Sequence, residues 1–138
     1  MRILITGSNG LLGQKLLHKL RQDSSVELIA TSKGVNRVSE QNSYTYFDLD
    51  ITNNDAVAQL IASEKPQVVI NTAAMTNVDL CEDEKQACDA LNVDAVRYLA
   101  NACEKIDAHL IQISTDFIFD GEDGPYKEED KPNPLSYY

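Results

Sequence analysis

Glycines at three-residue intervals directly after an apolar run constrain the fold of this chain more than any other feature. The run Ile3–Thr6 is followed by Gly7, Gly10 and Gly13, and leucines then recur at helical spacing from Leu11. A strand, a glycine turn and a helix in this order form a βα corner, whose helix N-terminus offers unpaired N–H groups and a positive dipole end to an anion. The first residues therefore predict a site for the pyrophosphate of a dinucleotide.

Each glycine has its own expected role. Gly7 permits a positive φ at the sharp exit from the strand, Gly10 lets the backbone approach the phosphates, and Gly13 lets the helix pack closely. Ser8 and Asn9 are expected to cap the helix through their side-chain oxygens. The spacing is G-x-x-G-x-x-G rather than G-x-G-x-x-G, so a glycine turn without a ligand is the alternative interpretation.

Composition and charge exclude several classes of protein. A chain of 138 residues with 43% hydrophobic content fits one globular domain. Its net charge of −10 argues against a nucleic-acid partner, and no apolar stretch approaches the roughly 20 residues of a membrane span. Cys81, Cys88 and Cys103 are odd in number and lack CxxC spacing. This pattern predicts reduced thiols in a cytoplasmic protein, without a metal site.

Strand-like and helix-like patterns alternate along the chain. The expected strands are Ile3–Thr6, Val26–Thr31, Tyr44–Asp48, Val68–Asn71 and Leu110–Ser114. Helices are expected at Leu11–Leu20, from a Thr52 cap to Pro66, and over Glu82–Lys105, the last with core positions Ala87, Leu91, Val96, Leu99, Ala100 and Cys103. The segments Lys33–Ser43 and Thr115–Tyr138 read as irregular. The alternation predicts an α/β fold, a doubly wound parallel sheet of the Rossmann type.

The residues after the second strand bear on the choice of cofactor. An NAD site usually carries an acid here for the ribose hydroxyls, whereas this chain has Thr31, Ser32 and Lys33. A hydroxyl and a cation suit the 2′-phosphate of NADP, so NADPH is favoured over NADH, with a solvated Lys33 as the alternative. Asp48 is expected either to accept a hydrogen bond from the adenine amino group or to serve as a turn aspartate. The small Ala73 and Ala74 would allow close approach of a cofactor ribose.

Four motifs in sequence order resemble the extended short-chain dehydrogenase/reductases and, more narrowly, the RmlD-like family of dTDP-4-dehydrorhamnose reductases. They are Thr6–Gly13 (TGSNGLLG), Asn71–Asp79 (NTAAMTNVD), Ser114–Gly121 (STDFIFDG) and Pro132–Tyr138 (PNPLSYY). The resemblance implies NAD(P)H-dependent reduction of the 4-keto group of a dTDP-4-dehydro-6-deoxy sugar, in dTDP-L-rhamnose biosynthesis. It also implies that residues 1–138 form an incomplete NAD(P)-binding Rossmann domain, lacking the last strands and the C-terminal substrate domain.

Site residues also follow from the resemblance. Thr115 matches the residue that holds and polarises the substrate ketone, Asp116 lies beside the sugar, and Tyr138 matches the catalytic proton donor, with Tyr137 as its neighbour. Taken together with the reading of the residues above, the expected cofactor contacts are Gly7, Asn9, Gly10, Leu11, Leu12, Gly13, Ser32, Lys33, Asp48, Leu49, Ala73, Ala74, Thr76 and Tyr138. The implied partners are a nucleotide-sugar substrate and, in the full-length protein, a second copy in a homodimer.

The expected chemistry requires a cation near the tyrosine. A phenol with a pKa near 10 donates its proton to a developing alkoxide more readily when a neighbouring cation lowers that pKa. The family places this cation on a lysine four residues after the tyrosine, beyond Tyr138, so we expect residues 1–138 alone to be catalytically inactive. Two alternatives remain open, a nucleotide-binding regulatory subunit similar to methionine adenosyltransferase β and a sugar-nucleotide epimerase. Phe117, where related dehydratases carry Glu, argues against a dehydratase.

Overall fold

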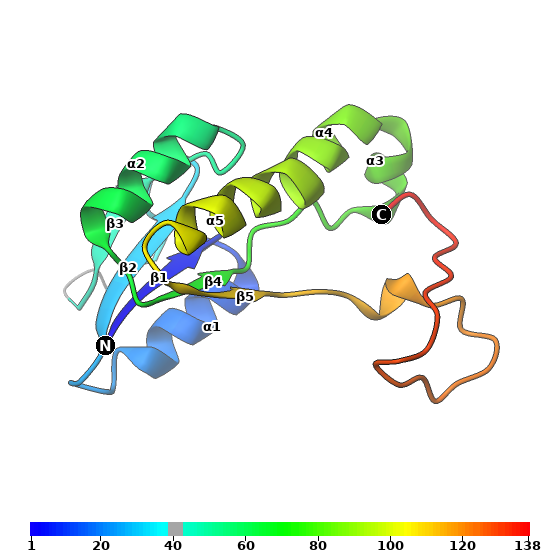
Figure 1. The fold of residues 1–138 in the computed structure, drawn as a ribbon, viewed down its shortest axis with the longest axis horizontal. Coiled ribbons are helices and arrows are strands. Elements are labelled where there is room, and N and C mark those ends of the chain that lie inside the picture. Colours follow the sequence, from blue (N-terminus) through cyan, green and yellow to red (C-terminus); the bar gives the residue numbers. More distant parts are fainter. Residues whose placement is uncertain (39–42) are drawn as a thin grey trace.

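A parallel sheet organises the computed structural model, which describes residues 1–38 and 43–138. Within these residues the strand order is β3-β2-β1-β4-β5, and every neighbouring pair is parallel (Figure 1). The strands are β1 (Arg2–Thr6), β2 (Glu27–Ser32), β3 (Thr45–Asp48), β4 (Val68–Asn71) and β5 (His109–Gln112). The predicted doubly wound sheet is thereby confirmed. Residues 39–42 of the predicted irregular segment Lys33–Ser43 lie outside the described residues.

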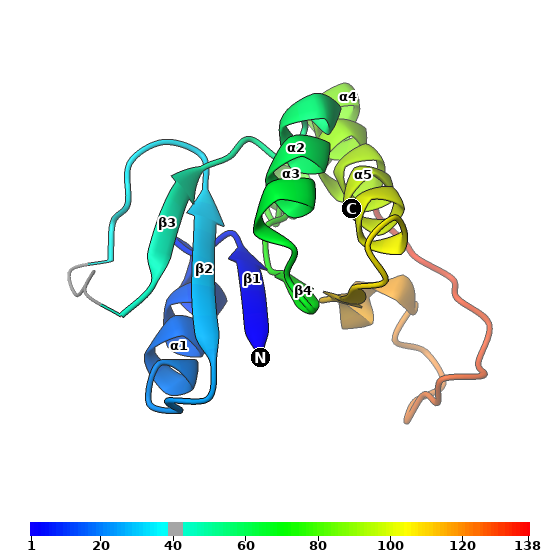
Figure 2. The ribbon, with the colours of Figure 1, turned by 60° about the vertical axis from the view of Figure 1, so that its left-hand side comes forward.

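Helices cover both faces of the sheet (Figure 2). Helix α1 (Leu11–Leu20) lies on one face, and α2 (Asn54–Glu64) and α5 (Ala95–Glu104) lie on the other. Side chains alternate between the faces along β1, so Ile3 and Ile5 pack with α1 while Leu4 joins the core beneath α2 and α5. Burial on both sides explains why the central strands are continuously apolar. No helix in the described ranges is long and apolar enough to cross a membrane.

The predicted helix caps were wrong. Asn53 caps α2 by accepting a 3.1 Å hydrogen bond from the Ala56 N–H, while the Thr52 hydroxyl bonds to Asp50 at 2.7 Å. The backbone of Asn53 is extended and its side-chain oxygen reaches the third residue onward, as an N-cap requires. At α1 the N-cap is Gly10, with no side-chain cap.

The predicted helix Glu82–Lys105 is not continuous. It consists of α3 (Val78–Asp83, which begins earlier), α4 (Lys85–Asp89), a π-helical segment at Ala90–Asp94, and α5. Glu84 has non-helical angles (φ −114°, ψ 55°), and each π turn takes one more residue than an α turn, so a single helical period cannot describe both sides. Ala87 and Ala100 are therefore exposed, whereas Leu99 and Cys103 are buried as predicted, together with the unpredicted Cys88, Ala95 and Ala102. The last predicted irregular segment contains a 3₁₀ turn at Asp116–Ile118.

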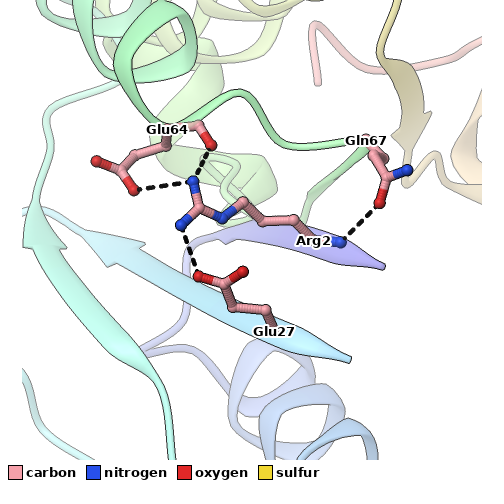
Figure 3. Close-up of polar contacts among 4 residues, drawn as sticks. All are labelled: Arg2, Glu27, Glu64 and Gln67. Carbon is pink, nitrogen blue, oxygen red and sulfur yellow. Dashed lines mark hydrogen bonds and ion pairs between the residues drawn. The ribbon is translucent and has the colours of Figure 1, made fainter. Parts of the chain in front are cut away.

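Arg2 connects several elements at the amino ends of the strands (Figure 3). Its guanidinium contacts the Glu27 carboxylate at 2.6 Å and the Glu64 carboxylate at 3.7 Å, and also donates to the Glu64 carbonyl. Its backbone N–H donates to the Gln67 side chain at 3.0 Å. The hydrogen bond from Arg2 lowers the pKa of Glu27. This cluster links β1, β2 and the end of α2 at the edge opposite the carboxyl ends of the strands.

Candidate functional site

The turn after β1 is a tight backbone cradle. Gly7 has φ +65°, as predicted, and a Cβ there would lie 2.7 Å from the Ala73 nitrogen. A Cβ on Gly13 would lie 2.4 Å from the Gly7 carbonyl oxygen, whereas one on Gly10 would lie 3.2 Å from that oxygen. Gly7 and Gly13 therefore bring the turn against both α1 and the loop after β4, and no side chain fits at either position.

The N-terminus of α1 fits an anionic group. Its first turn carries no acidic residue and no side-chain cap, so its leading N–H groups keep their hydrogen-bonding capacity. Leu11 is 80% exposed and Leu12 is 43% exposed, so the start of α1 lies at the surface. Ser8 lies behind the turn, fully buried, with its hydroxyl unpaired among the described residues. The cradle and the open helix end together suit a pyrophosphate.

A cavity of about 280 Å³ lies at the carboxyl ends of β1, β2, β3 and β4. It collects half of the predicted cofactor residues, which are far apart in sequence. Its walls are Gly7, Gly10, Ser32, Lys33, Leu49, Asp50, Ile51, Thr72, Ala73, Ala74 and Leu91. This cavity is hereafter the first cavity.

Acidic side chains hold the loop that follows β2. Lys33 forms a 2.7 Å ion pair with Asp50, and this hydrogen bond raises the pKa of Lys33 and lowers that of Asp50. Asp48 accepts a 2.6 Å hydrogen bond from the Gly34 N–H. Lys33 is thus a cation held at the wall of the first cavity, and Asp48 shapes the adjoining turn.

The Asn9 side chain forms two hydrogen bonds that the sequence did not predict. Its Nδ2 donates to the Val35 carbonyl at 2.9 Å, and its Oδ1 accepts from the Arg37 N–H at 2.8 Å. The predicted helix cap therefore ties the glycine turn to the loop after β2. The start of α1 has no side-chain cap.

A second cavity, of about 240 Å³, brings Thr115 and Tyr138 together. It is lined by Ala73, Ala74, Asn92, Val96, Gln112, Ile113, Ser114, Thr115, Ile118 and Tyr138. Ala73 and Ala74 also line the first cavity, so the two spaces share one wall. The predicted contact Thr76 is exposed on the loop between β4 and α3 and lines neither cavity.

Local contacts fix the predicted catalytic residues. The Thr115 hydroxyl accepts a 3.2 Å hydrogen bond from the Phe117 N–H and so caps the 3₁₀ turn. The Tyr138 ring packs edge-on against Phe117, with ring centroids 6.0 Å apart. Asp116 lines a larger hollow of about 630 Å³, together with aromatic residues of the C-terminal segment such as Phe119 and Tyr126.

Asn92 is a site residue that sequence reasoning missed. Its amide donates to the Met75 carbonyl at 3.0 Å and accepts from the Met75 N–H at 2.8 Å, while its side chain lines the second cavity. It lies in the π-helical segment, a feature frequently found at functional sites. The available signal was an amide between Leu91 and Val93 in an otherwise apolar stretch.

The comparisons with known proteins agree with this arrangement. The family model described as the RmlD substrate binding domain matches residues 1–138. The chain belongs to this RmlD family. This places it among the extended short-chain dehydrogenase/reductases, and the expected family is thereby confirmed.

Similar RmlD relatives carry two different names. A dTDP-4-dehydrorhamnose reductase from Aggregatibacter actinomycetemcomitans is 39% identical over 99% of this chain and 42% of its own length. Methionine adenosyltransferase 2 subunit beta from Bos taurus is 36% identical over 99% of this chain and 39% of its own length. The chain thus spans about two fifths of these curated relatives.

A solved RmlD relative identifies one bound cofactor. The dTDP-4-dehydrorhamnose reductase of Bacillus anthracis, crystallised in complex with NADP, is 33% identical to this chain. It superposes with a TM-score of 0.79, covering 99% of this chain and 44% of the solved chain.

Proposed function

We propose that this chain is the cofactor-binding part of an NADPH-dependent reductase of the 4-keto group of a dTDP-4-dehydro-6-deoxy sugar. The observation that carries the proposal is the shared wall of Ala73 and Ala74. It connects the backbone cradle at Gly7 and Gly10 to the cavity that is lined by Thr115 and Tyr138. A dinucleotide reaching from the cradle to the second cavity would pass the two smallest side chains of that wall.

The chain's own residues have distinct roles in this proposal. The backbone at Gly7 and Gly10 receives the pyrophosphate, and Ser32 and Lys33 receive the 2′-phosphate. Lys33 is already held at the rim by Asp50, so the 2′-phosphate would compete with that carboxylate for the ammonium group. NADPH, when bound, supplies a hydride.

Thr115 and Tyr138 handle the substrate oxygen. The Thr115 hydroxyl donates a hydrogen bond to the ketone oxygen, and the Tyr138 phenol gives its proton to that oxygen as the alkoxide develops. The resemblance places the cation that lowers the tyrosine pKa four residues beyond Tyr138. We therefore expect residues 1–138 alone to bind the cofactor without reducing the ketone.

Calorimetry on the 138-residue chain tests the cofactor assignment. We expect NADPH to bind about tenfold more tightly than NADH, because one ammonium–phosphate contact contributes roughly 1.5 kcal/mol. Lys33→Ala removes this preference, whereas Lys19→Ala, on the exposed surface of α1, retains it. Equal affinity for the two nucleotides, or no binding at millimolar concentration, would contradict the assignment.

Steady-state kinetics on a protein that includes the downstream residues tests the reaction. We expect Tyr138→Phe to lower kcat by about a hundredfold, in the range for loss of a general acid. Tyr98→Phe, on α5, serves as the matched control and retains activity. Full activity in Tyr138→Phe would exclude this tyrosine as the proton donor.

A regulatory subunit is the second candidate function, favoured by the 36% identity to methionine adenosyltransferase 2 subunit beta. Such a protein would bind the nucleotide and lack turnover even with its downstream residues present. The sequence after Tyr138 separates the two candidates, because Gly-x-Ser-Lys there favours the reductase.

A further inference from the structure

Tyr137 is held by the consecutive helices α3 and α4 through three contacts. Its backbone N–H donates to the Glu82 carboxylate at 2.6 Å, and its hydroxyl donates to the Asp89 carboxylate at 2.8 Å. The Lys85 ammonium lies 5.0 Å from the centre of its ring. Figure 1 shows the C-terminal end of the chain beside α3 and α4, far along the sequence from both. Glu82, Lys85 and Asp89 are called the tyrosine clamp below.

Buried neighbouring residues fix the two carboxylates of the tyrosine clamp in place. Glu82 follows Cys81, Asp89 follows Cys88, and both cysteines are buried at 0% and 3% exposure. Burial, together with a hydrogen bond to Cys88, raises the pKa of Cys81 to about 11, so this thiol stays protonated where α3 packs against α4. Asn92, which follows α4, also anchors these helices. Its amide donates to the Cys88 sulfur at 3.4 Å and forms two hydrogen bonds with the backbone of Met75. The two carboxylates therefore project from anchored helices.

Tyr137 and Tyr138 turn to different parts of the molecule. Tyr137 contacts α3 and α4, while the Tyr138 ring lies against Phe117 and lines the second cavity with Thr115. Because the two residues share a peptide bond, the position of the Tyr137 backbone limits where the Tyr138 ring can lie.

We infer that Glu82 and Asp89 are positioning residues that, by holding Tyr137, place the phenol of Tyr138 in the second cavity beside Thr115. The inference rests on the proposed function for its catalytic meaning, but the placement itself is measurable without catalysis. Displacing a reacting group by about 1 Å can lower a rate by around a hundredfold. Loss of the clamp should therefore lower the rate of proton donation while leaving the cofactor cradle unchanged.

The placement is tested by NMR on the 138-residue chain. We expect the Tyr137 amide to be protected from hydrogen exchange and the rings of Phe117 and Tyr138 to show an NOE. Glu82→Ala combined with Asp89→Ala should speed exchange of that amide about tenfold and abolish the NOE. Asp83→Asn, an exposed neighbour on α3, should change neither signal. Unchanged protection and NOE in the double variant would overturn the inference, whether or not the protein is a reductase.

The catalytic consequence is tested on the protein with its downstream residues. We expect Glu82→Ala to lower kcat about tenfold with an unchanged KM for NADPH. Glu82→Gln should restore most of kcat, because its amide oxygen accepts the same N–H, and Asp83→Asn should match the wild type. An unaltered kcat in Glu82→Ala, or a loss that Glu82→Gln does not repair, would contradict a positioning role. A wild-type protein without reductase activity would count against the proposed function alone, because the NMR result still decides the placement.

Discussion

Gly10 and Gly13 differ in how an added methyl group would fit, although they lie one helical turn apart. Gly13→Ala would press Cβ against backbone atoms of Gly7 and Ser8, which cannot rotate away. We expect it to lower the free energy of unfolding by about 2 kcal/mol, the usual cost of overpacking. Gly10→Ala meets only one atom, at 3.2 Å, so it should cost clearly less stability and yet weaken NADPH binding about tenfold by obstructing the phosphates.

Urea unfolding and nucleotide titration of both variants would separate the two effects. A Gly13→Ala protein as stable as the wild type would show that the turn relaxes. A Gly10→Ala protein with wild-type affinity would place the phosphates elsewhere.

The loop after β2 depends on Asn9, and α2 depends on Asn53, so two asparagines offer a matched comparison at the scale of elements. Asn9→Ala removes both hydrogen bonds to residues 35–37, and we expect NADPH affinity to fall about fivefold, the equivalent of roughly 1 kcal/mol for a lost hydrogen bond. Asn53→Ala removes a helix cap, and should cost about 1 kcal/mol of stability without affecting the nucleotide. Thermal denaturation and calorimetry on both variants would test this. A loss of NADPH affinity in Asn53→Ala would show that the helix cap and the nucleotide site are not independent.

The C-terminal segment carries a carboxylate that responds to acid. The pKa of Asp120 is lowered from 3.8 to about 2. The largest cause is the hydrogen bond from the Tyr126 hydroxyl, and the next is the hydrogen bond from Asn133. Because the folded-state pKa lies below the unfolded one, the stabilisation is fully present above pH 4 and is lost as the pH falls toward about 2. We expect Tyr126→Phe to raise the Asp120 pKa toward 3.8, as measured by NMR titration of the carboxyl carbon. An unchanged pKa would show that the phenol is not the main partner.

Strand positions were largely predictable, because apolar runs between turn residues indicate strands without tertiary information. The helical region 78–104 was not predictable in the same way. It breaks at Glu84 and contains a π-helical segment at Ala90–Asp94, and a single helical period cannot represent either feature. Ala87 and Ala100 look like core residues in the sequence and are exposed for this reason.

For the whole molecule, Arg2 and the proposed nucleotide site occupy opposite ends of the sheet. Arg2→Met removes contacts to Glu27 and Glu64, and we expect a lower melting temperature, with a larger decrease at low salt than at high salt. NADPH affinity should stay unchanged. Arg97→Met is the matched control, because its partner Asp94 lies on the preceding turn of the same helical region and joins no second element. Equal melting temperatures for the two variants would show that contacts between elements add no more stability than a contact within one helical region.

At the same scale, the sequence indicated which loops meet at the site but not the contacts between them. Parallel topology brings the ends of β1, β2, β4 and β5 to one edge, so Gly7, Ser32 and Ala73 could be predicted as neighbours. The ion pair of Lys33 with Asp50, the bonds of Asn9 and the grip of Asn92 on Met75 depend on side-chain directions that no periodicity encodes.

The central place of β1 has a consequence for folding kinetics. β1 precedes the other four described strands in the chain but pairs in parallel with β2 and β4, and its contact from Arg2 to Gln67 spans 65 residues. Such non-local pairing requires long loops to close before they are stabilised, which slows folding relative to a helical bundle. On the ribosome, Gly7 emerges long before Ala73, the residue against which it packs. The glycine cradle, where we propose that the nucleotide binds, therefore forms only after the fourth strand is in place, and it matures late during synthesis.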